Sequence, residues 1–163
     1  MNTSATFFKM MLFVIAVLSI SSAHAQQGTA GSIDLNWVNA PASLPAGAKL
    51  AMVQGDLAKP GTLVFRLKLP AGYQLKPQSS PAIDRIMVIS GALYLGSGEK
   101  FDNARTIPLY TGYGHWPNNG PYFAFTKEET VVEIEGVGPW AVNYVNPTDD
   151  PMKTRRVSSA AIR

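Results

Sequence analysis

The stretch GYQLKPQSSPAIDRIMVISG, Gly72–Gly91, decides the fold of this chain. A glycine stands at each end, where the chain is expected to turn. Within it, the apolar run Ile86–Ile89 is typical of a short buried strand. Among the polar side chains that precede that run are Gln78, Ser80 and Asp84.

Short strand signals separated by glycine and proline continue on both sides of this stretch. The clearest covers residues 62–69, where Leu63, Phe65, Leu67 and Leu69 alternate with less apolar residues. The other predicted strands cover residues 34–38, 48–54, 86–89, 92–95, 106–109, 114–116, 122–126, 131–137 and 140–144. After the first 25 residues, no amphipathic helical pattern of about ten residues or more is evident. This pattern predicts an all-β sandwich or barrel, in one domain over residues 34–151.

The residue spacing of the opening stretch resembles the first motif of the cupin superfamily. In that motif a glycine is followed by five residues, His-x-His, three or four residues, Glu, six residues and a second glycine. This chain has Gln78 and Ser80 at the histidine positions and Asp84 at the glutamate position. Residues 117–122 resemble the second cupin motif, with Tyr122 at its histidine position. The resemblance implies a cupin-like jelly-roll β-barrel.

The resemblance also implies where a metal would lie, because in cupins these four positions converge inside the barrel and hold a divalent ion. Here the four groups are an amide, a hydroxyl, one carboxylate and a phenol, which form a poor transition-metal site. The chain has two histidines, and His24 lies in the predicted leader, which leaves His115. We therefore expect no metal at these positions and no cofactor.

The first 25 residues have the pattern of a secretory signal peptide. Lys9 precedes an apolar run, residues 10–20, and Ala23-His24-Ala25 is typical of a cleavage site before Gln26. The run is too short to span a bilayer as a helix. We expect an exported protein, periplasmic or secreted, without a membrane anchor after cleavage.

The positive charge of the chain, +3 at pH 7, is concentrated near its end. Lys153, Arg155, Arg156 and Arg163 lie in the last 11 residues. We interpret residues 152–163 as a basic, disordered tail, so the charge does not indicate nucleic-acid binding.

Three functional hypotheses follow. The first is a non-enzymatic domain that binds or senses a small molecule through Gln78, Ser80, Asp84 and Tyr122, in a pocket also lined by His115, Trp116 and Phe125. The second is a metal-free isomerase, lyase or hydrolase that uses Asp84, Tyr122 or His115 as acid or base. The third is a structural or interaction domain without a ligand, and a homodimer is one partner arrangement that we consider.

Overall fold

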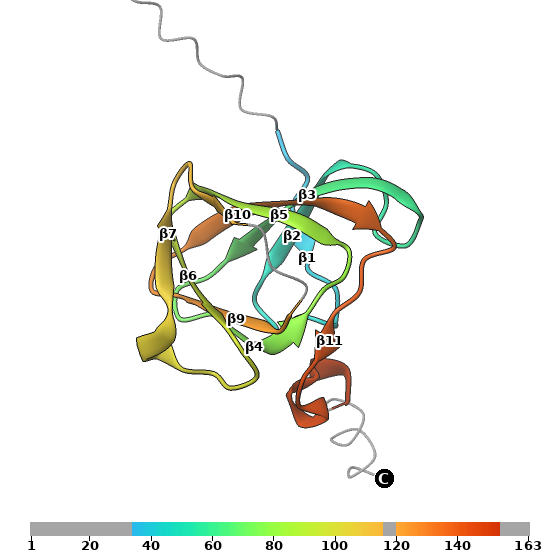
Figure 1. Ribbon diagram of the computed structural model, residues 1–163. Coiled ribbons are helices and arrows are strands. Elements are labelled where there is room, and N and C mark those ends of the chain that lie inside the picture. The colour runs from blue at the N-terminus through green and yellow to red at the C-terminus, as the bar shows by residue number, and fades with distance from the viewer. Residues whose placement is uncertain (1–33, 116–119, 154–163) are drawn as a thin grey trace, which may run out of the picture. The chain divides into compact units, whose positions relative to one another are not determined.

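Two antiparallel sheets make up the part of the chain that the computed structural model describes, residues 34–115 and 120–153, with His115 described by its backbone only. The first sheet has six strands in the order β1-β2-β3-β10-β5-β8. Their bounds are Val38–Asn39 (β1), Lys49–Gln54 (β2), Gly61–Leu69 (β3), Thr130–Gly138 (β10), Ile83–Ser90 (β5) and Gly114–His115 (β8). Figure 1 shows β2, β3, β10 and β5 side by side in this layer.

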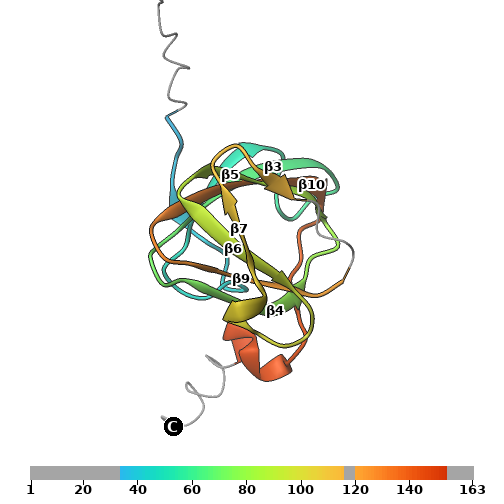
Figure 2. The ribbon, with the colours of Figure 1, turned by 60° about the vertical axis from the view of Figure 1, so that its left-hand side comes forward.

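The second sheet has five strands in the order β11-β4-β9-β6-β7. Their bounds are Asn143–Tyr144 (β11), Gln74–Ser79 (β4), Tyr122–Thr126 (β9), Ala92–Ser97 (β6) and Ile107–Tyr110 (β7), and the 3-10 helix Asn103–Arg105 (η1) precedes β7. The two layers enclose a common interior (Figure 2). This arrangement confirms the predicted all-β jelly roll.

The centre of the first sheet follows directly from residue alternation. In β3, Leu63, Phe65, Leu67 and Leu69 are each at most 3% exposed. β10 pairs with β3 in one continuous register that sets Ile134 opposite Phe65. Because β10 alternates in the same way, its apolar side chains face the same interior. The strands predicted at 62–69, 122–126 and 131–137 agree with the observed β3, β9 and β10 to within one residue at each end.

β4 contains a bulge that sets the direction of Gln78. Leu75 pairs with Ala124 and Gln78 with Tyr122, so three steps on β4 match two on β9. A bulge absorbs the extra residue and keeps Leu75 and Gln78 on one face, although their spacing would place them on opposite faces of a regular strand. Pro77 lies in this bulge, where a residue without an N–H is tolerated.

A second bulge lies in β5 and turns Asp84 outward. Glu135 of β10 pairs with Arg85, but Gly136 pairs with Ile83, which leaves Asp84 as the extra residue. Ile83 and Ile86 are buried, whereas Asp84 is exposed. Arg85 forms an ion pair with Glu135 on the outer side of the sheet.

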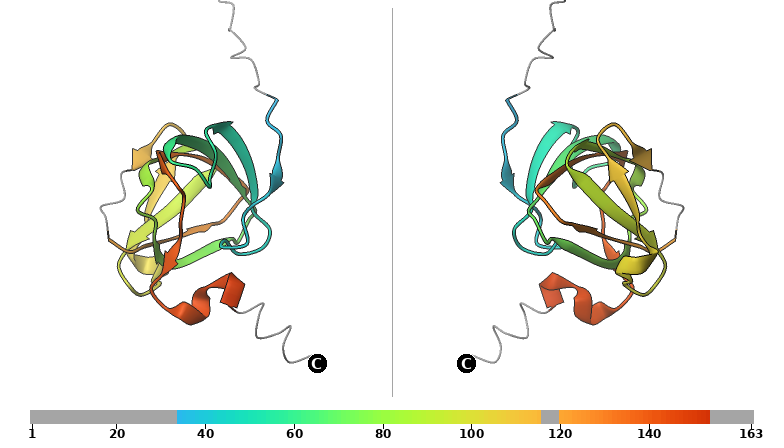
Figure 3. Two further views of the ribbon diagram at one scale, coloured as in Figure 1. Left: turned by 90° about the vertical axis from the view of Figure 1, so that its right-hand side faces the viewer. Right: turned by 90° about the vertical axis from the view of Figure 1, so that its left-hand side faces the viewer.

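The segment after β10 returns to the second sheet. It passes through Trp140, pairs with β4 as β11, and enters the 3-10 helix Pro147–Asp149 (η2). Both views in Figure 3 show this run from the first sheet to η2. Within the described ranges, no helix has the length and apolar character needed to cross a membrane.

Gly136 is required for the β5 bulge, because a Cβ there would overlap the carbonyl oxygen of Ala82. We predict that Gly136→Ala lowers the free energy of unfolding by about 3 kcal/mol or more, since backbone atoms cannot move aside as a flexible side chain would. Urea denaturation measures this. Gly114→Ala is the matched control, because the Cβ there would make only ordinary contacts, 3.5 Å from the Ile86 carbonyl oxygen. Equal losses of unfolding free energy in the two variants would contradict a specific requirement for glycine at position 136.

Candidate functional site

A small apolar cavity lies between the two sheets. Its volume is about 30 Å³, enough for one or two water molecules. Most of its lining is aliphatic and comes from both sheets and from the loop before β2: Leu44, Leu67, Leu69, Leu75, Ile83, Ile86, Leu93, Leu95, Ala124, Val132 and Ile134. Three other residues complete the lining, namely Gln78, Tyr122 and Trp140. None of the described lining residues carries a charge.

Gln78 places an amide in this apolar interior. The side chain is 2% exposed, and the β4 bulge turns it toward the cavity. Its strand position lies between Tyr122 of β9 and Tyr144 of β11, which are its register partners on the two sides. The amide oxygen Oε1 is buried and accepts no hydrogen bond from the described protein groups. An unpaired acceptor of this kind is uncommon in a folded protein and requires an explanation.

Tyr122 is held in its neutral form beside Gln78. Burial raises the pKa of its phenol to about 12, and a hydrogen bond with the Gln78 side chain acts in the opposite direction. At neutral pH the phenol is therefore protonated and can take part in hydrogen bonding but cannot act as an anionic ligand. Burial also raises the pKa of Tyr144, and the nearby Asp150 carboxylate adds to this effect.

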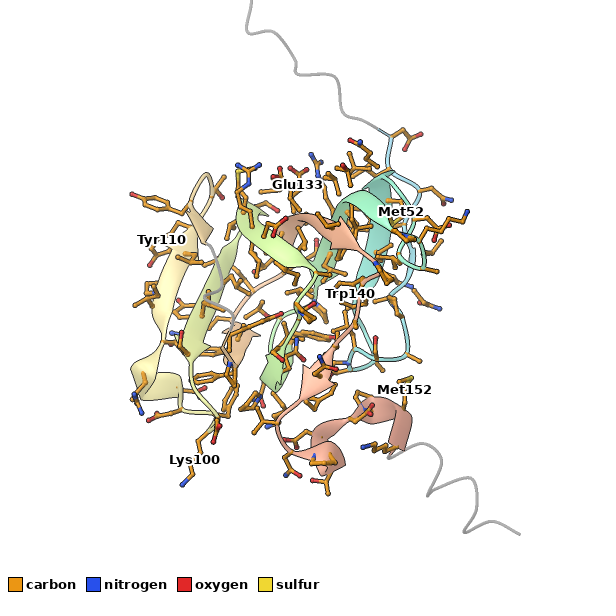
Figure 4. All side chains as sticks on the ribbon, turned by 45° about the vertical axis from the view of Figure 1, so that its right-hand side comes forward. Met52, Lys100, Tyr110, Glu133, Trp140 and Met152 are labelled. Atoms are coloured by element: carbon orange, nitrogen blue, oxygen red, sulfur yellow. The ribbon has the colours of Figure 1, made fainter. Side chains whose placement is uncertain are left out.

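Trp140 supplies the second unpaired polar atom. Its indole nitrogen Nε1 is buried and has no acceptor among the described groups. The ring packs edge-on against Phe65, with centroids 5.6 Å apart. The backbone N–H of Trp140 donates to the Leu57 carbonyl at 2.8 Å, which anchors the residue to the β2–β3 connection. Figure 4 shows Trp140 among the strands of the barrel.

Ser80 and Asp84 do not present free groups to the cavity. Ser80 is buried, and its hydroxyl donates to the Ala141 carbonyl at 2.6 Å. That bond connects the end of β4 to the segment that carries Trp140, so Ser80 helps to hold Trp140 in the cavity lining. Asp84 is exposed on the outer side of β5. The structure thus brings Gln78 and Tyr122 together and leaves Asp84 apart from them.

Of the three further residues predicted to line the pocket, Phe125 is the one whose side chain the structure describes. Phe125 points away from the interior, because Ala124 beside it lines the cavity. Its ring stacks on Tyr94 at 4.7 Å, on the outer face of the second sheet. His115 pairs with Ile86 through its backbone, and its side chain lies outside what the structure describes, as does Trp116.

The residues at the cupin ligand positions do not fit a metal ion. Tyr122 stays protonated, Ser80 is engaged with a carbonyl, and Asp84 faces away. Gln78 alone offers a free oxygen, and a neutral amide is a weak ligand for a transition metal. In the described ranges no group of three or more His, Cys, Asp or Glu side chains could hold a metal ion.

Among the cavity residues, the sequence predicts a site role only for Gln78 and Tyr122. It predicts Trp140 only as the start of a strand, and it gives Leu44 no site role. The turn residues around Leu44, and the Gly138-Pro139 pair just before Trp140, indicate loops near a barrel end. No sequence signal shows that either side chain folds back into the interior.

Comparison with solved structures shows the cupin fold. The polyketide cyclase RemF from Streptomyces resistomycificus is 16% identical, with 76% of this chain and 88% of that chain covered and a TM-score of 0.56. A putative acetylacetone dioxygenase from Methylibium petroleiphilum is 12% identical, with coverage of 72% and 79% and a TM-score of 0.55. An acetylacetone dioxygenase from Acinetobacter johnsonii is 12% identical, with coverage of 92% and 88% and a TM-score of 0.54. No family model and no curated protein matches the sequence.

The raised pKa of Tyr122 predicts a loss of stability in alkali. Between pH 10 and about pH 12 the unfolded chain releases a proton that the folded chain retains. Each pH unit in this window should therefore reduce the free energy of unfolding by up to about 1.4 kcal/mol through Tyr122. Denaturation curves measured from pH 9 to 12 should show that the free energy of unfolding falls less steeply with pH in Tyr122→Phe than in the wild type. Tyr113→Phe, at an exposed site, is the control, and an unchanged slope in Tyr122→Phe would contradict the prediction.

Proposed function

We propose that this barrel binds a small, uncharged organic molecule in its interior. The observation that carries the proposal is a pair of buried, unpaired polar atoms in one otherwise apolar cavity. One is an acceptor, Gln78 Oε1, and the other is a donor, Trp140 Nε1. Both side chains line the same cavity. A few polar groups converging in an apolar pocket are characteristic of small-molecule sites.

Because the pair consists of one acceptor and one donor, it favours a ligand group that can both donate and accept a hydrogen bond. A hydroxyl group can donate a hydrogen bond to Gln78 Oε1 and accept one from Trp140 Nε1. The described lining has no charged side chain to neutralise an ion, so an anion or cation would lose its hydration without compensation. The favoured class is therefore a neutral compound with one hydroxyl on an apolar body.

The energetic cost of burying an amide in this apolar interior supports the same conclusion. A buried polar group without a partner destabilises a fold by about 1–3 kcal/mol. An apolar side chain of similar shape at position 78 would avoid that penalty. A ligand that supplies the missing partners gives a physical reason for an amide at this place.

The acid–base hypothesis receives less support from the geometry. Asp84 is exposed on the outer side, and Tyr122 is enclosed, so these two groups share no site. A phenol with a pKa of about 12 is also a poor base near neutral pH, because almost none of it is ionised. Binding, which needs only hydrogen bonds and apolar contact, requires neither group to exchange a proton.

Phenol titrated into the isotopically labelled protein tests the proposal by NMR. We expect saturable shifts of cavity methyl groups, and about tenfold weaker binding in Gln78→Met, which keeps the side-chain length but removes the acceptor. Gln74→Met is the matched control, since Gln74 lies on the same strand with an exposed side chain. Benzoate, the charged analogue, should not bind.

Two outcomes would overturn this proposal. One is an absence of saturable phenol binding to the wild-type protein. The other is equal phenol affinity in the wild type and Gln78→Met, because binding would then not depend on the unpaired amide. Thermal unfolding of both variants would show that each remains folded.

We also propose that the protein is exported, on the sequence of residues 1–25 alone. Expression of the full chain in a bacterium should yield a mature protein that begins at Gln26, as measured by intact mass. Ala25→Leu should abolish this cleavage, because the peptidase requires a small residue at that position. Recovery of the uncleaved wild-type chain from the cytoplasmic fraction would contradict export.

A further inference from the structure

The loop between β1 and β2, here called the Leu44 loop (Pro41–Gly47), closes one side of the cavity. Leu44 is 2% exposed and belongs to the core, although its neighbours in the loop are partly or fully exposed. Its side chain lines the interior cavity. The same residue lines a surface crevice of about 370 Å³, formed by residues 39, 40 and 44–48. Leu44 is the residue that the two linings share.

Two tyrosine hydroxyls attach this loop to the barrel, one on each side of Leu44. Tyr144 donates to the Ser43 carbonyl at 2.8 Å, and Tyr73 donates to the Pro45 carbonyl at 2.6 Å. The base of the loop is closed by a backbone bond from the Ala40 N–H to the Ala48 carbonyl at 3.1 Å. The loop follows β1, a two-residue strand at the edge of its sheet with exposed side chains. Local opening therefore needs to break two side-chain bonds and a short edge pairing and to expose Leu44, and it leaves the paired strands β3 and β10 intact.

The cavity volume makes such opening necessary for ligand binding. About 30 Å³ accommodates one or two water molecules and no organic molecule. The space that a ligand requires lies next to it, in the crevice on the other side of Leu44. The crevice lining also contains no charged residue. A neutral ligand could therefore extend from the interior into the crevice without desolvating an ion.

We propose that Leu44 is a removable plug that gates the interior site and sets the size of the molecule that the site admits. This inference rests on the interior binding proposed above. With the plug withdrawn, the cavity and the crevice form one elongated space. The ligand class is then a neutral hydroxyl compound longer than phenol, with its hydroxyl at Gln78 and Trp140 and its apolar remainder along the path of Leu44.

The size preference of Leu44→Ala tests the plug directly. The probes are phenol and 4-propylphenol, titrated into the wild type and the variant by NMR. Each methylene accommodated should tighten binding by about fourfold, so the variant should favour 4-propylphenol over phenol by tenfold or more relative to the wild type. An unchanged preference, with phenol still bound by the wild type, would overturn the plug and leave the interior site standing. A wild type that binds neither probe would refute the interior site.

A second experiment tests the gate without any ligand, and it remains informative if Leu44→Ala fails to fold. The Ala40 amide donates to the Ala48 carbonyl at 3.1 Å across the base of the loop, so its hydrogen exchange reports on loss of the edge pairing that opening requires. We expect this amide to exchange much faster than β3 amides, and about fivefold to tenfold faster still in Tyr144→Phe, with β3 unchanged. Tyr113→Phe is the control, since Tyr113 is 65% exposed. Exchange of the Ala40 amide at the β3 rate in the wild type would overturn the gate, because it would show that the edge pairing opens only by global unfolding.

Discussion

Gly61–Leu69 pairs with Thr130–Gly138 over its whole length without a register shift, and this pairing determines which side chains of the two longest strands face the interior. The strands on either side, β2 and β5, pair with these two through shifted registers. The regular centre therefore supplies a continuous apolar wall. Departures from regularity lie in the flanking strands and in the opposite sheet, where polar side chains can be turned inward or outward.

The interior combines two environments that oppose each other. Its aliphatic wall stabilises the barrel through burial, and the same wall separates the Gln78 amide and the Trp140 indole from bulk water. Tyr122 offsets part of the cost of burying the Gln78 amide, because it forms a hydrogen bond with that side chain while remaining neutral. Ser80 contributes indirectly, because its bond to Ala141 holds the Trp140 segment against β4.

Much of the fold follows from local patterns, and the site depends on features that such patterns do not encode. The alternation in β3 and β10 predicts both strands well, because each has one buried face. β4 was missed as a strand, because Pro77 and its bulge interrupt the alternation. The cupin resemblance implies that Asp84 lies inside, and the β5 bulge places it outside. Trp140 reaches the interior through contact with Phe65, which is distant in sequence, and no local signal encodes that contact.

The bulges before Gln78 and at Asp84 show that equal residue spacing need not give equal side-chain direction. A bulge changes which side of a strand the residues beyond it face, while the number of residues between two positions is unchanged. Here one bulge lies at the β4 positions before Gln78 and the other at Asp84. Both fall within the stretch whose spacing defines the motif, and that spacing is retained. The retained spacing therefore does not by itself determine which of these side chains face the interior.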